Sequence, residues 1–238
     1  MATIDELTKT AIAISNKANI SSLMSAELYA LIGDSVTLEE ITAKQIRLNW
    51  STKTLAGVQD LQGLVFVNPT RIYLKGNTDS ANPTLPEASI DVRGLTQLQW
   101  LRSTQLGSIP FFGDISSYTS LTNIELSLNT LGTSLIIPNL SSLPDLVTVN
   151  LAGGTGSFTL AQFGNLGALK KLSSYTVSNQ NIGTAIVDNI LSTLLEAKQA
   201  GCPLTTVNLQ SCQAPTGGNS NAARLALIAA GVSVTTRA

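Results

Sequence analysis

Histidine is absent from the 238 residues, and this absence excludes several kinds of site together. Without imidazole there is no Ser-His-Asp or Cys-His nucleophile, no histidine general base and no histidine metal ligand. Charged residues make up only 12% of the chain, about half of the ~25% usual for soluble domains. The net charge is −1, and the few lysines and arginines are scattered. We therefore expect no nucleic-acid partner, because such a partner needs a basic stripe.

Cysteine and long apolar runs are also scarce. Cys202 and Cys212 are too few for a disulfide framework, and their spacing misses the C-x-x-C pattern of redox and zinc sites. We expect both to be small buried residues. The longest apolar runs, such as 64–67 and 225–230, are far shorter than the ~20 residues of a membrane-spanning helix. The amino-terminal segment MATIDELTKT lacks the basic start and apolar run of a signal peptide, so we expect synthesis in a cytoplasm without membrane insertion.

A repeat is the strongest feature that the chain does have. The segment YTSLTNIELSLN, centred on Ile124, follows the pattern L-x-x-L-x-x-I-x-L-x-x-N with Tyr118 in the first position, and LPDLVTVNLAGG repeats it over 143–154. A period in the twenties with this spacing is typical of a leucine-rich-repeat solenoid, in which each repeat adds one short strand to a curved parallel sheet. The sequence therefore predicts an α/β fold of this kind.

Six strands can be aligned on the position of Ile124, at unequal intervals that lie mostly in the twenties. Because side chains alternate along a strand, these anchors are predicted to face the core and their neighbours to face the other side. The anchors are Ile72, Leu101, Ile124, Val149, Tyr175 and Val207. A leucine precedes five of them by three positions, at Leu98, Leu121, Leu146, Leu172 and Leu204. The fifth position after the anchor holds Asn77, Asn129 and Cys212, as the repeat consensus expects.

Residues 1–55 are predicted to be helical and 56–238 to form the solenoid with its terminal cap. Thr3-x-x-Glu6 and Thr37-x-x-Glu40 are capping boxes that begin helices, the second of them extending to Leu48. Such helices can cover the open core of the first repeat, or they can attach the solenoid to a larger assembly. The candidate docking residues are Ile12, Ile14, Leu28 and Tyr29.

The carboxyl-terminal part is predicted to contain two helices and a last strand. Apolar residues at helical spacing indicate a helix over 182–200, and the pattern indicates another over 219–230 that Gly231 ends. The last strand is predicted over 232–234, with Val232 in the anchor position, one repeat after Val207. Together the second helix and this strand would form a cap on the last repeat.

This terminal segment, over 184–238, resembles that of bacteriophage virion and tail-associated structural proteins. The matching residues are Ala214-Pro215-Thr216, Ala223, Leu227-Ile228, Gly231 and Val234-Thr235-Thr236. The chain departs from the pattern at Val232, where family members usually carry an aromatic residue. The resemblance implies a virion structural protein, tail- or capsid-associated, with no chemistry of its own. Its partners would be other virion proteins through the amino-terminal helices, and a host surface protein, a glycan or a second copy of the chain.

No motif in the chain carries recognisable chemistry. The run Gly153-Gly154-Thr155-Gly156 lacks the Lys-Ser/Thr of a phosphate loop, and neither a G-x-S-x-G elbow nor a calcium loop is present. A glycosidase needs paired carboxylates, and only Glu125 is placed centrally on the predicted sheet face. We therefore expect no enzyme, no cofactor and no metal.

A binding surface is the remaining functional prediction. Aromatic and charged residues flank the anchors on the predicted concave face and gather toward its amino-terminal side. The candidate residues are Arg71, Tyr73, Trp100, Arg102, Glu125 and Asn150. The alternative is an ordinary polar face with Trp100 tucked under the loop at 77–89. Phe111 and Phe112 are a second candidate patch, in a loop at the sheet edge, with one of the two in the core. For function, the alternative to a virion protein is a bacterial leucine-rich-repeat binding module, an adhesin or effector.

Overall fold

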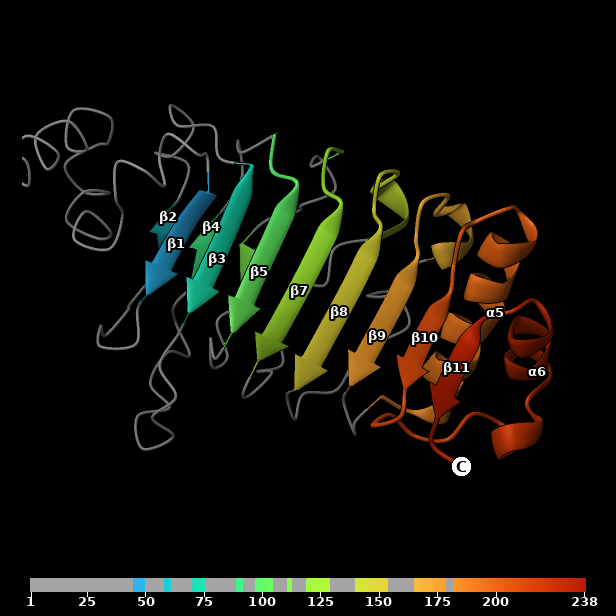
Figure 1. The fold of residues 1–238 in the computed structure, drawn as a ribbon. Coiled ribbons are helices and arrows are strands. Elements are labelled where there is room, and N and C mark those ends of the chain that lie inside the picture. Colours follow the sequence, from blue (N-terminus) through green and yellow to red (C-terminus); the bar gives the residue numbers. More distant parts are fainter. Residues whose placement is uncertain are drawn as a thin grey trace, which may run out of the picture.

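A computed structural model describes 45–49, 58–60, 70–75, 89–91, 97–104, 111–112, 119–128, 140–153, 165–178 and 182–238. These residues form an eight-stranded sheet in which every neighbouring pair of strands is parallel. The strands follow one another in chain order across the sheet (Figure 1). They are β1 (Gln45–Asn49), β3 (Arg71–Lys75), β5 (Trp100–Thr104), β7 (Asn123–Leu128), β8 (Thr148–Gly153), β9 (Ser174–Ser178), β10 (Thr206–Leu209) and β11 (Ser233–Thr236). The predicted α/β class with a parallel sheet is confirmed at this level.

A second, three-stranded parallel sheet lies in the connections between the first strands. It contains β2 (Val58–Asp60), β4 (Ser89–Asp91) and β6 (Phe111–Phe112). The sequence pattern gives 107–114 as irregular and places Phe111 and Phe112 in a loop, and this prediction is wrong, because the pair is a strand. A strand of two residues is too short to show alternation.

Helices replace these short strands in the later connections. The elements are η3 (Leu140–Ser142), η4 (Leu166–Ala168), α5 (Thr184–Gln199), η5 (Gly218–Ser220) and α6 (Ala222–Ala229). Figure 1 shows β2 and β4 behind the larger sheet and α5 and α6 behind and beside β10 and β11. The face turned toward the viewer carries none of the described helices or strands. We call it the open face.

The register of the larger sheet agrees with the alignment of the repeats. Each anchor lies opposite the next, from Ile72 through to Val207. All six anchors are at most 1% exposed, and so are the five leucines three positions before them. Stacking therefore buries the apolar side of each strand against its neighbours, because one repeat alone cannot cover it.

The sheet begins earlier than the sequence pattern predicts. Gln45–Asn49, inside the segment 1–55 predicted to be helical, form β1, and Ile46 lies opposite Ile72. A helix that extends to Leu48 is therefore wrong. The segment QIRLN has the same alternation as RIYLK in β3, which the helical spacing from Thr37 obscured. The other helices predicted before it, and the docking residues Ile12, Ile14, Leu28 and Tyr29, lie outside the described residues.

The carboxyl-terminal elements form as predicted, with two shifts. The helix predicted over 219–230 begins at Ala222, because the side chain of Asn221 accepts a hydrogen bond from the N–H of Arg224 and caps it. The last strand begins at Ser233, and its residue opposite Val207 is Val234 rather than Val232. Val232 is buried in the turn, where its N–H donates to the carbonyl of Leu227. Gly231 ends α6 with a φ of 81°, in the region that glycine adopts without strain.

Candidate binding face of the larger sheet

The sheet register brings the residues of the open face into columns across the strands. Neighbours in a column stand on adjacent strands, about 4.8 Å apart in the hydrogen-bonding direction. The first column is Gln45, Arg71, Trp100, Asn123, Thr148, Ser174, Thr206 and Ser233. The second is Arg47, Tyr73, Arg102, Glu125, Asn150, Thr176, Asn208 and Thr235. All six predicted binding residues therefore lie in two adjacent columns, as the spacing predicts.

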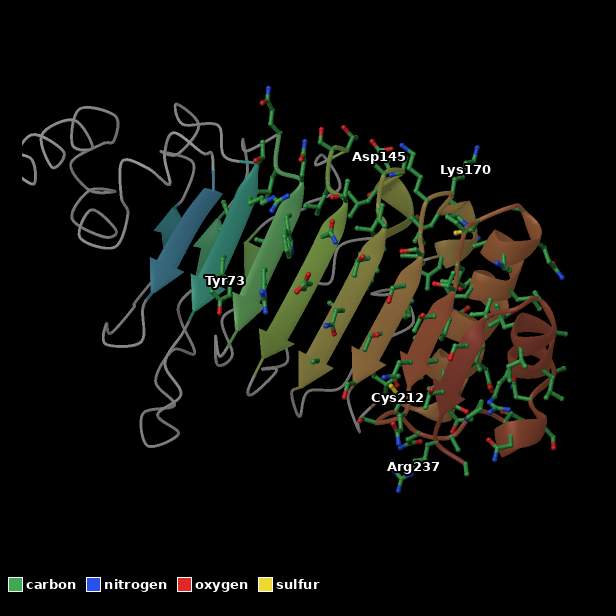
Figure 2. The ribbon with its side chains drawn as sticks, in the orientation of Figure 1. Tyr73, Asp145, Lys170, Cys212 and Arg237 are labelled. Carbon is green, nitrogen blue, oxygen red and sulfur yellow. The ribbon has the colours of Figure 1, made fainter. Side chains whose placement is uncertain are left out.

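Arginine and aromatic residues alternate where β3 meets β5. The guanidinium of Arg71 lies over the indole of Trp100, with its Cζ 4.9 Å from the ring centroid. In the second column the order is reversed, and the Cζ of Arg102 lies 5.2 Å from the centroid of the Tyr73 ring. Figure 2 shows Tyr73 projecting from β3 on the open face. Both distances are within the range of cation–π attraction, so each ring attracts one guanidinium.

Glu125 extends this group onto β7. Its Oε2 lies 3.4 Å from Nε of Arg102, and the two side chains are 24% and 47% exposed. A pair this exposed adds little to stability, about 0–1 kcal/mol. It does offset the charge of Arg102. Among the described residues, no carboxylate pairs with Arg71. We call Arg71, Tyr73, Trp100, Arg102 and Glu125 the arginine–aromatic cluster.

Trp100 is neither fully exposed nor fully buried. The residue is half-buried, yet its Nε1 is buried and, within the described ranges, has no hydrogen-bond partner. An indole N–H usually finds a partner when it is buried. Of the loop considered as its cover, 77–89, only Ser89 is described, in β4.

From β7 onward, the two columns consist of hydroxyl and amide side chains apart from Glu125. Asn150 lies next to Glu125 in the second column, so it borders the cluster without belonging to it. Thr148, Asn150, Ser174 and Thr176 are all half-buried. Among the described residues, none of these four side chains forms a hydrogen bond. Their donors and acceptors are therefore free for other groups.

Two sets of polar contacts escape the sequence pattern. The hydroxyl groups two positions before three anchors donate to main-chain carbonyls of the preceding turn: Thr122 to Gln99 at 2.9 Å, Ser173 to Val147 at 3.2 Å and Thr205 to Ser173 at 3.0 Å. The recurrence of Thr or Ser at this position was a signal that the alignment contained. These contacts join neighbouring repeats at the amino-terminal ends of β7, β9 and β10.

The second set belongs to the loop after β10 that contains Ala214-Pro215-Thr216. The carboxylate of Asp188 on α5 accepts hydrogen bonds from the N–H of Thr216 at 2.9 Å, from the Thr216 hydroxyl, and from Nδ2 of Asn221 at 3.1 Å. Thr184 on the same helix donates to the carbonyl of Ala214 at 2.8 Å. The hydrogen bonds of Asp188 therefore hold the carboxyl-terminal loop against α5, and this residue is not part of the open face.

The two cysteines are buried, as predicted, and form no disulfide. The thiol of Cys202 donates to the carbonyl of Leu172 at 3.0 Å, and that of Cys212 to Val177 at 3.3 Å. Burial raises the pKa of the Cys202 thiol, against the lowering effects of its backbone hydrogen bonds and of Lys198. Among the described residues no group of three or more potential ligands is arranged to hold a metal ion. Within the same residues, no helix has the length and apolar character needed to cross a bilayer.

Comparisons with known proteins add no relative. No family model matches the chain, and the searches of curated proteins and of solved structures gave no significant match.

Proposed function

We propose that this chain is a non-enzymatic leucine-rich-repeat solenoid of a bacteriophage particle, tail- or capsid-associated, that presents its open face to a protein or a glycan. The arginine–aromatic cluster is the observation that carries the binding role. Arginine, tryptophan and tyrosine are the residue types that dominate binding energies. Here they are gathered on one side of a sheet, where the fold does not need them for burial.

The order of the strands supports the solenoid. Eight parallel strands follow one another in chain order, with a buried leucine three positions before five of the six anchors. Such an array offers a broad, rigid face whose length grows with each repeat, which suits contact with an extended partner.

The terminal cap supports the virion assignment through the motif residues. Thr216 binds Asp188, Leu227 is fully buried, and Gly231 ends α6. Each of these three motif residues therefore stabilises the segment that covers the last repeat. Virion proteins that share these residues would be expected to share the same terminal cap.

The carboxylates of the open face support the proposal that the chain is not an enzyme. Glu125 is the single carboxylate among the described residues of the two columns, and Arg102 pairs with it. Acid–base hydrolysis of a glycoside needs two carboxylates flanking one bond.

Mass spectrometry of purified particles tests the virion assignment. The chain is expected in particles at a fixed copy number, and purified chain is expected to compete with particles for adsorption to host cells. Absence of the chain from particles that contain the head and tail proteins would overturn the proposal.

A bacterial binding module, an adhesin or effector, is the second candidate. The motif residues of the cap make contacts within the chain, and every solenoid needs such a cap, so the cap does not require a particle. This candidate expects a free chain that captures a host protein, with neighbouring genes for secretion in place of head and tail genes.

A further inference from the structure

We propose that the open face binds an acidic glycan, with Arg71 on the carboxylate of an acidic sugar and the polar side chains of β7 to β9 on the neutral sugars beside it. This inference rests on the proposed function, since it names the ligand class for the same face.

Arg71 is the position for the acid group. The Cζ of its guanidinium lies over the Trp100 ring, 4.9 Å from the ring centroid, and the residue is exposed. A guanidinium presents its N–H groups in a planar fork that matches a carboxylate. A carboxylate can accept two parallel hydrogen bonds from such a fork. Because Trp100 already fixes the orientation of the side chain, less conformational freedom is lost on binding.

Arg102 has a different role. It also lies over a ring, that of Tyr73, but Glu125 offsets its charge. Of the two arginines in the cluster, Arg71 is therefore the one that no described carboxylate pairs with. From β7 onward the two columns hold no lysine or arginine. A densely charged polymer needs cations along its whole length to replace its counterions, so the match from β7 onward is to neutral units.

The columns beyond the cluster match the neutral units. Thr148, Asn150, Ser174 and Thr176 offer donors and acceptors together, free of partners in the described chain. Sugar hydroxyls also donate and accept, so each can pair with this face. At about 4.8 Å a strand, the path from β3 to β9 is roughly 19 Å. That length fits an extended oligosaccharide of several sugars.

An acidic peptide fits the same face less well. Peptide and protein partners bind through apolar or aromatic anchors surrounded by a polar rim. From β7 onward, the two columns contain no apolar side chain. The hydroxyl and amide surface therefore favours the glycan.

Binding of the purified full chain to an array of immobilised acidic and neutral glycans tests the inference. Carboxylated glycans are expected to bind, and the same glycans with the carboxylate reduced to an alcohol are expected to bind far more weakly. Arg71→Ala is expected to lower affinity by about tenfold to a hundredfold, and Arg71→Lys to restore only part of it. Asn150→Ala is expected to lower it by about two- to tenfold. Arg237→Ala is the matched control. It removes the same charge at an exposed site beyond β11 (Figure 2) and is expected to leave the affinity for the glycan unchanged.

Four results would overturn the inference: no glycan bound, equal binding of the reduced glycans, equal effects of Arg71→Ala and Arg237→Ala, or tighter binding of poly-glutamate. A second measurement avoids substitution at Arg71. In the Trp50→Phe chain Trp100 is the single tryptophan, and its fluorescence is expected to change with the carboxylated glycan and not with the reduced one.

The two proposals fail separately. A chain that is present in particles but binds no glycan would contradict the glycan inference alone. A chain that binds acidic glycans but is absent from particles would contradict the virion assignment alone.

Discussion

Asp188 on α5 binds Thr216, far along the chain in the loop before α6, through both the main-chain N–H and the hydroxyl. Asn221, the cap of α6, donates to the same carboxylate and to the carbonyl of Thr216. One side chain thus fixes the loop and the start of the last helix. The carboxyl-terminal end of the larger sheet depends on this contact, because η5, α6 and β11 form a small unit beside α5.

The first prediction concerns this carboxylate. Asp188→Ala removes three hydrogen bonds to a charged acceptor and is expected to lower the free energy of unfolding by about 2 kcal/mol. Urea unfolding followed by circular dichroism measures it. Asp145→Ala is the matched control, since Asp145 pairs with Lys171 on the surface with side chains 42% and 60% exposed. That pair is expected to contribute less than about 0.5 kcal/mol. Equal losses for the two variants would contradict the role of Asp188.

The second prediction concerns Tyr175. Its side chain is fully buried at an anchor position, and its hydroxyl has no hydrogen-bond partner among the residues that the structure describes. Tyr175→Phe is expected to raise the free energy of unfolding by about 1 kcal/mol, because a buried polar group without a partner is unfavourable. Tyr175→Ala is the contrasting variant and is expected to lose about 3–5 kcal/mol. A loss of stability in Tyr175→Phe would show that the hydroxyl has a favourable contact.

The third prediction is the pH dependence of the same residue. Burial, with a smaller effect from Cys212, raises the pKa of Tyr175 above its usual value near 10. The folded chain then keeps the phenol proton where the unfolded chain loses it. This part of the stability is complete below pH ~10 and decreases by about 1.4 kcal/mol per pH unit above it. The wild type is therefore expected to lose more stability than Tyr175→Phe between about pH 9 and 11.5. Parallel curves would contradict the assignment.

The fourth prediction concerns thiol reactivity. Both cysteines are at most 3% exposed, and each thiol donates to a main-chain carbonyl. Since the thiolate is the reactive form and burial raises the pKa of Cys202, neither is expected to react with an aromatic disulfide reagent at about pH 8 in the folded chain. Two thiols per chain are expected to react in denaturant. Rapid reaction of one thiol before unfolding would show that the sheet edge there opens locally.

The fifth prediction compares two neighbours on α6. Leu227 is fully buried and Ile228 is 41% exposed. Leu227→Ala is expected to lower the free energy of unfolding by about 3 kcal/mol. Ile228→Ala is expected to change it by less than about 1 kcal/mol, because the lost contact is small and alanine favours the helix. Urea unfolding of both variants measures the difference, and the reverse order would mean that the helix is rotated on the end of the sheet.

Much of the larger sheet was predictable because its signals are local and repeated. Alternation along each strand tells which side of it is buried, and a leucine three positions before the anchor sets the register of each repeat. That is why the columns from Arg71 to Asn208 could be written from the sequence. The signals fail where elements are short or ambiguous: β6 is too brief to alternate, and β1 was hidden in a stretch that also fits a helix.

The sequence alone determined which residues share a column, because strand register follows from a period that the chain carries in every repeat. Only the tertiary structure decided which side chains in those columns contact each other. Arg71 lies over Trp100, while Arg102 lies over Tyr73 and pairs with Glu125. Such contacts depend on the rotamers that the surrounding packing allows, and no periodic pattern records them. The same holds for Asp188 and Thr216, which meet because the last loop folds back onto α5.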